Sequence, residues 1–219
     1  MEPFKLSNVM KINKLVRFFV LSDLFLLMGW GFVEPVFALF VVQRIVGATL
    51  ITVGWAAAIY LIVRALLQTP IALILDRLDG ESDDFYTLVM GLLLLGVTAF
   101  LYTSISGIWE FYFVQGVRAI AMACYGATWP AIFGRHLDAN RHAFEWSLDS
   151  TIVGIGAGIS GVLGSAIANA FGFSILFFIV GIMSLLSAAI IMLVPHITLP
   201  RKSLQESFFL QKDHSTLTH

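Results

Sequence analysis

The chain has 219 residues, of which 58% are hydrophobic and only 12% are charged, and its formal net charge is −1. Soluble domains carry about 25% charged residues, so this composition excludes an ordinary soluble enzyme and indicates a membrane protein. The single cysteine, Cys124, excludes a disulfide within the chain.

Six apolar stretches predict six transmembrane helices, because each meets or nearly meets the length of about 20 residues that spanning requires. They cover residues 16–43, 48–74, 86–104, 109–134, 143–169 and 173–195. The first follows a basic segment, as in a signal peptide, but it continues to Val42. That is longer than a signal peptide's apolar region of about 7–15 residues, so we interpret it as an uncleaved span. The predicted organisation is an N-terminal segment (1–15), a six-helix domain (16–195) and a tail (196–219).

Basic residues in the loops predict the orientation, because cytoplasmic loops are enriched in Lys and Arg. On one side lie Lys5, Lys11, Lys14, Arg17, Arg77, Arg135, Arg141, Arg201, Lys202 and Lys212. The other side has only Arg44. We therefore expect both termini in the cytoplasm and the chain as a multi-pass protein of the cell (inner) membrane.

Charges inside the predicted helices fall on the first, second, fourth and fifth of them. These residues are Asp23, Glu34, Arg64, Arg118, Glu145 and Asp149. A charge at the centre of a membrane helix costs about 2.5–3.5 kcal/mol on insertion scales, so it must face protein or water. The pattern predicts an all-α bundle with helices 1, 2, 4 and 5 around a polar centre. The charge-free third and sixth helices are expected on the outside.

The depth of each charge follows from a rise of about 1.5 Å per residue. By this measure Glu34 and Arg118 lie at the same depth, and Arg64 lies within reach of Asp23 or Asp149. Asp23 and Glu34 are three helical turns apart and are expected on one face, as are Glu145 and Asp149.

Four intramembrane acids accompany two arginines. The excess predicts that at least one of the acids is protonated near neutral pH and carries protons, and it favours a neutral or cationic solute over an anion. The alternative is a static network of salt bridges that only fixes helix packing.

Other residues of these helices are candidates for contacts with a solute or with a second chain. Trp30, Tyr60, Gln115 and Tyr125 are possible solute contacts, although the aromatic residues can equally be packing residues. The fifth stretch contains Gly154, Gly156, Gly158, Gly161 and Gly164. Small residues at this spacing let helices approach closely, either within the chain or between protomers. We find no nucleotide-binding, hydrolase or metal-site spacing, so we expect no enzyme activity, no cofactor, no metal and no nucleic-acid partner.

Three segments resemble motifs of the major facilitator superfamily. Residues 72–80, with Asp76-Arg77, are similar to the signature Gly-x-x-x-Asp-Arg-x-Gly-Arg-Arg/Lys between helices 2 and 3. Gln115-Gly116 is similar to Arg-x-x-Gln-Gly, with Tyr112 at the arginine position. Residues 160–165 resemble the antiporter motif Gly-Pro-x-x-Gly-Gly, with its proline absent.

The resemblance implies one half of a twelve-helix transporter, whose halves are related by an axis along the membrane normal. It assigns Asp76 and Arg77 to a gating loop. We therefore expect a parallel, two-fold homodimer, although the chain could instead pair with a different half. The expected function is secondary transport of a small solute, with proton-coupled symport through the buried carboxylates. A channel or flippase, and a membrane subunit without transport activity, are the alternatives.

Overall fold

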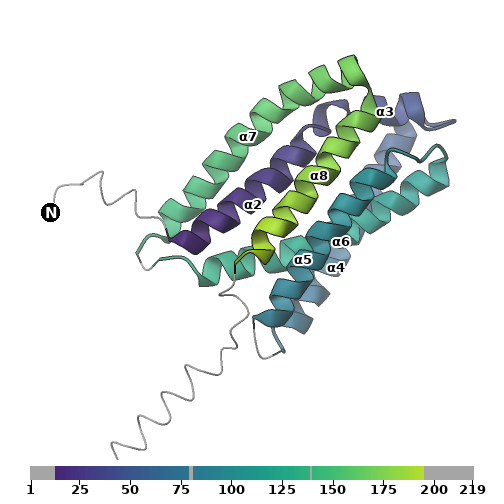
Figure 1. Cartoon of the computed structure of the whole chain (residues 1–219). Helices are drawn as coiled ribbons and strands as arrows, with labels where there is room; N and C mark the ends of the chain where they lie inside the picture. Colours follow the sequence, from purple (N-terminus) through teal and green to yellow (C-terminus); the bar gives the residue numbers. More distant parts are fainter. Residues whose placement is uncertain (1–12, 79–80, 139, 195–219) are drawn as a thin grey trace, which may run out of the picture.

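The computed structural model describes residues 13–78, 81–138 and 140–194 (Figure 1). The part described is helical and contains no strand. Its elements are α2 (Lys14–Gly31), η1 (Glu34–Val36), α3 (Phe37–Arg44), α4 (Leu50–Leu75), α5 (Ser82–Leu101), α6 (Ile108–Arg135), α7 (His142–Phe171) and α8 (Phe173–Met192). The six predicted stretches are thus six helical segments in the same order, the first formed by α2, η1 and α3 together. The predicted tail, 196–219, lies outside the described residues.

Short polar residues and glycine set several helix ends. The side chain of Asn13 accepts a hydrogen bond from the N–H of Leu15 at 3.1 Å and so caps α2. Thr49 and Thr52 form a capping box at the start of α4. Gly172, at φ +84°, joins α7 to α8 in a tight turn that favours glycine.

The first span is broken, which the sequence analysis did not predict. Helix α2 ends at Gly31, and η1 begins at Glu34. Pro35 has no N–H to donate to the carbonyl of Gly31, so the helix cannot continue regularly through this position. Asp23 is buried in α2, whereas Glu34 lies beyond the break and is exposed. The prediction that Asp23 and Glu34 share one helix face is therefore wrong.

The helices form two pairs that α5 and α8 connect (Figure 1). Helix α2 packs on α7, and α4 packs on α6. Helix α5 contacts α6 and α8, and α8 also contacts α2 and α7. The order of backbone contacts across the bundle is therefore α7, α2, α8, α5, α6 and α4, and side chains of the first span also contact α6, as Phe19 does with Trp129.

Five of these segments are long and apolar enough to cross a membrane, and α6 falls short on composition. It carries Glu110, Gln115 and Arg118 within its first three turns. Nevertheless α6 has 28 residues and packs along α4 and α5. The helix with the most polar composition is thus one that the bundle covers on two sides.

A proline in α6 creates a polar link to α4. Pro130 cannot donate a hydrogen bond to the carbonyl of Gly126. The amide nitrogen of Gln68, on α4, donates to this carbonyl instead, at 3.2 Å. A carbonyl without a partner is costly in lipid, so this bond satisfies a group that the proline has freed.

Helices α4 and α7 are much less covered than the others. In their most apolar windows only 11% of the α4 residues and 17% of the α7 residues are buried, against 56% in α5 and 44% in α8. The sequence analysis expected the charge-free α5 and α8 on the outside. Each does have an exposed apolar stripe, but within this chain the largest uncovered faces belong to α4 and α7. These faces include Trp55, Leu61, Ile62 and Leu66 on α4 and Ile155, Ile159, Val162 and Leu163 on α7.

The glycines of α7 fall on two different faces. A Cβ at Gly156 would meet side chains of α2, and a Cβ at Gly164 would overlap the backbone carbonyl of Phe32. Both glycines are buried and allow α7 to approach the first span closely. Gly154 and Gly158 have nothing within 4 Å of such a Cβ. Packing within the chain thus uses Gly156 and Gly164, and leaves the Gly154-x-x-x-Gly158 face open.

One end of the bundle is held by charged groups. Arg135, at the end of α6, forms an ion pair with Asp84, and its Nε lies 3.3 Å from Glu81. His136 Nε2 lies 3.5 Å from the same Glu81 carboxylate. The side chain of Asn13 donates to the carbonyl of His136 at 3.5 Å. These contacts join the start of α2 and the start of α5 to the end of α6.

Candidate functional site

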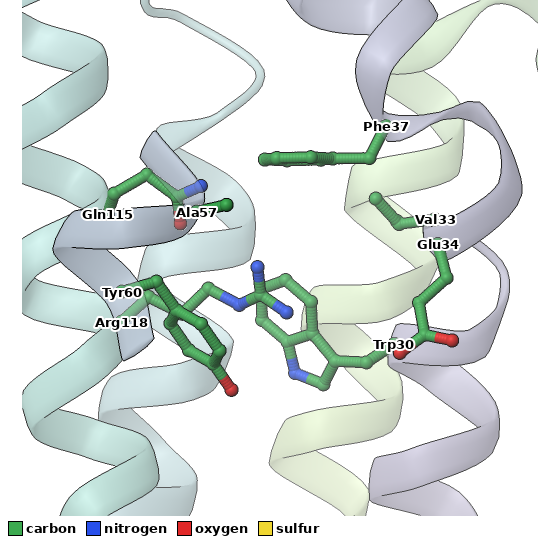
Figure 2. Close-up of a pocket in the computed structure, with 8 residues that line it drawn as sticks. All are labelled: Trp30, Val33, Glu34, Phe37, Ala57, Tyr60, Gln115 and Arg118. Atoms are coloured by element: carbon green, nitrogen blue, oxygen red, sulfur yellow. The ribbon is translucent and has the colours of Figure 1, made fainter. Parts of the chain in front are cut away.

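A hollow of about 210 Å³ opens between the first span and the α4–α6 pair (Figure 2). Its walls come from three segments that are separate in the sequence, and no residue of α5 or α8 lines it. The lining residues are Trp30, Val33, Glu34, Phe37, Ala57, Tyr60, Gln115 and Arg118. Pockets for drug-sized ligands measure about 300–1,000 Å³, so this hollow suits a smaller solute.

Arg118 occupies the centre of the hollow between aromatic rings. Its guanidinium carbon lies 3.9 Å from the centroid of the Trp30 ring and 4.6 Å from that of Tyr60. The ring of Phe37 is farther away, at 5.9 Å. Such cation–π contacts contribute about 0.5–2 kcal/mol each. They hold the planar guanidinium in place without neutralising its charge.

Gln115 lies one turn before Arg118 on α6. Its side chain is 1% exposed, and its oxygen accepts a hydrogen bond from the hydroxyl of Tyr102 at 2.8 Å. This bond fixes the amide orientation, so that the amide nitrogen is the group left to donate. Figure 2 shows this nitrogen directed toward the interior of the hollow.

Glu34 lines the same hollow but does not pair with Arg118. No ion pair between these two residues is present in the part of the chain that the structure describes. Figure 2 shows the Glu34 carboxylate next to Trp30 and apart from the guanidinium. The predicted direct pair is not formed, because the break after Gly31 turns Glu34 to the exposed side of the span.

A second polar site lies in the bundle, between α2, α6 and α7. Asp23 is 3% exposed and accepts a hydrogen bond from the hydroxyl of Tyr125. Asp149 is 5% exposed and close enough to Asp23 for the two carboxyls to interact electrostatically. Its Oδ1 has no hydrogen-bond partner among the described residues. The structure thus places Asp23 near Asp149 and places the hydroxyl of Tyr125 against Asp23, and neither contact was predicted from the sequence.

Arg64 does not make the expected salt bridge, whereas Glu145 shares a face with Asp149 as expected. Arg64 forms no salt bridge with Asp23 or Asp149 within the described ranges, although it is near enough to Tyr125 to interact with it electrostatically. Glu145 is fully buried on the same face of α7 as Asp149. One of its oxygens accepts a hydrogen bond from the backbone N–H of Asp138 at 3.0 Å, so it ties the loop before α7 to the helix.

Some contacts had little or no signal in the sequence. Tyr102, which orients Gln115, ends the charge-free third span and was not a candidate. The stacking of Trp30 on Arg118 was also not predicted. The loop candidates Asp76 and Arg77 are exposed after α4, and the motif positions 79 and 80 lie outside the described residues.

A model of the Major Facilitator Superfamily matches residues 19–216, which is most of the chain. The chain belongs to this superfamily. The membership confirms the predicted resemblance and groups the chain with membrane transporters and not with enzymes.

One relative and one solved structure indicate how much of the fold this chain represents. An uncharacterized MFS-type transporter of Methanocaldococcus jannaschii, MJ1560, is 22% identical over 184 residues, which are 82% of this chain and 45% of that protein. The solved structure of the POT family transporter PepTSo matches with a TM-score of 0.73 and 14% identity, over 87% of this chain and 39% of that one. The chain thus spans less than half the length of either relative, and the second match shows the shared fold alone.

Proposed function

We propose that this chain is a proton-coupled secondary transporter of a small solute and that it works as a parallel homodimer in the cell membrane. The observation that carries the proposal is the buried pair Asp23 and Asp149, which interact with each other and have no basic residue in salt-bridge contact within the described ranges. Superfamily membership supports the transport class.

Two neighbouring carboxyl groups suit a proton carrier. They repel each other when both are charged, and a shared proton relieves this repulsion. The hydroxyl of Tyr125 donates to Asp23 and stabilises its charged form, so the two carboxyl groups have different hydrogen-bond environments. Ionisable groups within membrane helices are functional by default, and these two lie on the neighbouring helices α2 and α7.

The homodimer is supported by the faces that this chain leaves uncovered. Helices α4 and α7 expose long apolar surfaces, and the hollow with Arg118 is open on one side. A second unit in the same orientation would cover these faces, as the second half does in a twelve-helix transporter. The bias of basic residues to one side favours parallel protomers with cytoplasmic termini.

Cysteine crosslinking tests the homodimer. The family's architecture implies that Asp76 of one protomer lies near Ala143, at the start of α7, in its partner. The N-terminus of a helix favours a nearby negative charge. Asp76→Cys and Ala143→Cys, combined in a Cys124→Ser background, should therefore give a crosslinked dimer in membranes. The measurement is the fraction of dimer on a denaturing gel.

The control for this crosslink is Trp109→Cys paired with Ala143→Cys. Trp109 is exposed at the start of α6, at the opposite end of that helix from Arg135 and the loop that leads into α7. This pair should give no dimer. A crosslink between chains with opposed termini, or a monomer in native mass spectrometry from mild detergent, would contradict the parallel homodimer.

Uptake into proteoliposomes, with and without a pH gradient, tests the function itself. A transporter should show saturable uptake that the gradient drives. A channel or flippase would conduct without ready saturation, and a membrane subunit would show neither behaviour. Saturable uptake that ignores the gradient would retain the transporter and remove the proton coupling.

A further inference from the structure

We propose that the hollow around Arg118 binds the carboxylate group of a small organic monoanion, and that this anion is the transported solute. The inference rests on the proposed function, since it names the solute class for the same protein. It departs from the count of charges in the sequence, which favoured a neutral or cationic solute.

The position of the charges is the reason for this departure. The acids that outnumber the arginines are mostly not in the hollow, because Asp23, Glu145 and Asp149 do not line it. Glu34 is the acid that does line it, and its carboxylate lies apart from the guanidinium of Arg118 (Figure 2). Arg118 forms no ion pair with any residue that the structure describes. The centre of the hollow is therefore cationic.

Arg118 interacts electrostatically with the hydroxyl of Tyr102, and its packing leaves the rest of the guanidinium edge for a ligand. Trp30 and Tyr60 lie against the guanidinium, with ring centroids 3.9 Å and 4.6 Å from its carbon. Aromatic rings pack on the faces of a guanidinium, and the N–H groups point outward in its plane. A carboxylate fits this edge with two parallel hydrogen bonds, which is the geometry in which arginine binds anions most strongly.

Hydrogen-bond donors without partners beside Arg118 also indicate an anion site. The Nε of Arg118 and the indole nitrogen of Trp30 are both buried without a hydrogen-bond partner among the described residues. The amide nitrogen of Gln115 is free to donate, because Tyr102 occupies the amide oxygen. Buried donors without partners are unusual. A group that only accepts hydrogen bonds, such as a carboxylate, matches this collection of donors.

The remaining walls limit the size and charge of the anion. Val33, Phe37 and Ala57 are apolar and can contact a short aliphatic or flat aromatic tail. The volume of about 210 Å³ excludes a large ligand. Glu34 would repel a second negative charge on the ligand, and a single arginine would not balance a dianion. The hollow therefore favours monocarboxylates over dicarboxylates and phosphate esters.

Titration calorimetry on the purified full chain in mild detergent tests the proposal. The probes are butyrate and benzoate, each compared with its neutral amide, together with butylamine. At least one carboxylate should bind saturably, and its amide and the amine should not. Arg118→Gln should weaken this binding by about 10–100-fold, as the loss of hydrogen bonds to a charged group implies. The affinity of Arg118→Lys for the carboxylate should lie between those of the original protein and Arg118→Gln. Lysine keeps the positive charge but cannot form the two parallel hydrogen bonds.

Arg44→Gln is the matched control, because Arg44 is exposed on α3 and bonds Ser174 at 3.2 Å, outside the hollow. It should bind the carboxylate like the original protein. A thermal melt of each variant separates misfolding from lost binding. The comparison of each carboxylate with its amide needs no variant at all. Equal binding of carboxylate and amide, or no saturable binding of either carboxylate, would overturn the proposal.

Uptake measurements separate this inference from the proposed function. Binding that depends on Arg118, without uptake into proteoliposomes, would retain the anion site and remove the transport activity. Uptake of another solute that neither carboxylate inhibits and that Arg118→Gln leaves unchanged would retain the transporter and remove the anion site.

Discussion

Gly164→Ala is expected to destabilise the protein strongly. The added Cβ would overlap the backbone carbonyl of Phe32, which lies where the first span breaks. A backbone group cannot move aside as a side-chain end can, so α7 would have to shift away from the first span. Overpacking of this kind costs about 1–3 kcal/mol, equivalent to a fall in melting temperature of roughly 3–10 °C. The measurement is a thermal melt in detergent.

Gly158→Ala is the matched control for this prediction. It lies on the same helix, and nothing is within 4 Å of its added Cβ. Alanine favours a helix over glycine by about 0.5–1 kcal/mol, so this variant should melt at the same temperature or higher. Equal losses in the two variants would show that α7 packs through a different face. A loss in Gly158→Ala that appears only in the dimer would instead place this face at the protomer interface.

Amide substitution of the buried carboxyls should abolish gradient-driven accumulation. Asparagine and glutamine imitate the protonated acid but cannot release a proton. At least one of Asp23→Asn, Asp149→Asn and Glu145→Gln should therefore lose accumulation and retain exchange of solute for solute. Asp23 and Asp149 are the stronger candidates, because Glu145 is engaged with the backbone of Asp138. The measurement is uptake and exchange in proteoliposomes over a range of pH.

The pH dependence has a defined sign. A carrier that must take up a proton before transport should work faster as the external pH falls, and the affected variant should lose this dependence. Glu110→Gln is the control, because that exposed carboxylate only accepts hydrogen bonds from the N–H groups of Ser106 and Gly107, at 3.2 Å each. It should leave accumulation intact. Unchanged gradient-driven uptake in all three buried-site variants would exclude proton coupling through these residues.

The spacing of residues along the chain predicted the features that a single helix determines. The six helical segments follow from the lengths of the apolar stretches, and the shared face of Glu145 and Asp149 follows from their separation by one helical turn. Depth alone was less informative, because it placed Arg64 within reach of Asp23 or Asp149, whereas the structure places the two acids near each other and forms neither salt bridge.

Contacts between side chains of different helices were harder to predict from the sequence. Arg118 was expected to bind Glu34 because opposite charges at one depth usually meet, but the break after Gly31 moved Glu34 away. Pro35 was the residue in the sequence that indicated this break. It lies within a continuous apolar stretch, which was interpreted as one unbroken helix. The stacking on Trp30 depends on rotamers and helix separations, which a linear pattern does not contain.

The bond between Gln68 and the carbonyl of Gly126 restricts how this protein can change shape. If α4 separated from α6, a bare carbonyl would remain in the apolar layer, at a cost of several kcal/mol. These two helices should therefore move together, as one rigid body, in any rearrangement of the bundle. The surface that must then rearrange is the one between this pair and the first span, where Trp30 contacts Arg118 and the hydroxyl of Tyr125 donates to Asp23. The stacked ring of Trp30 is held by forces with little directionality, so the hydrogen bond between Tyr125 and Asp23 is the directional contact that such a movement would have to break.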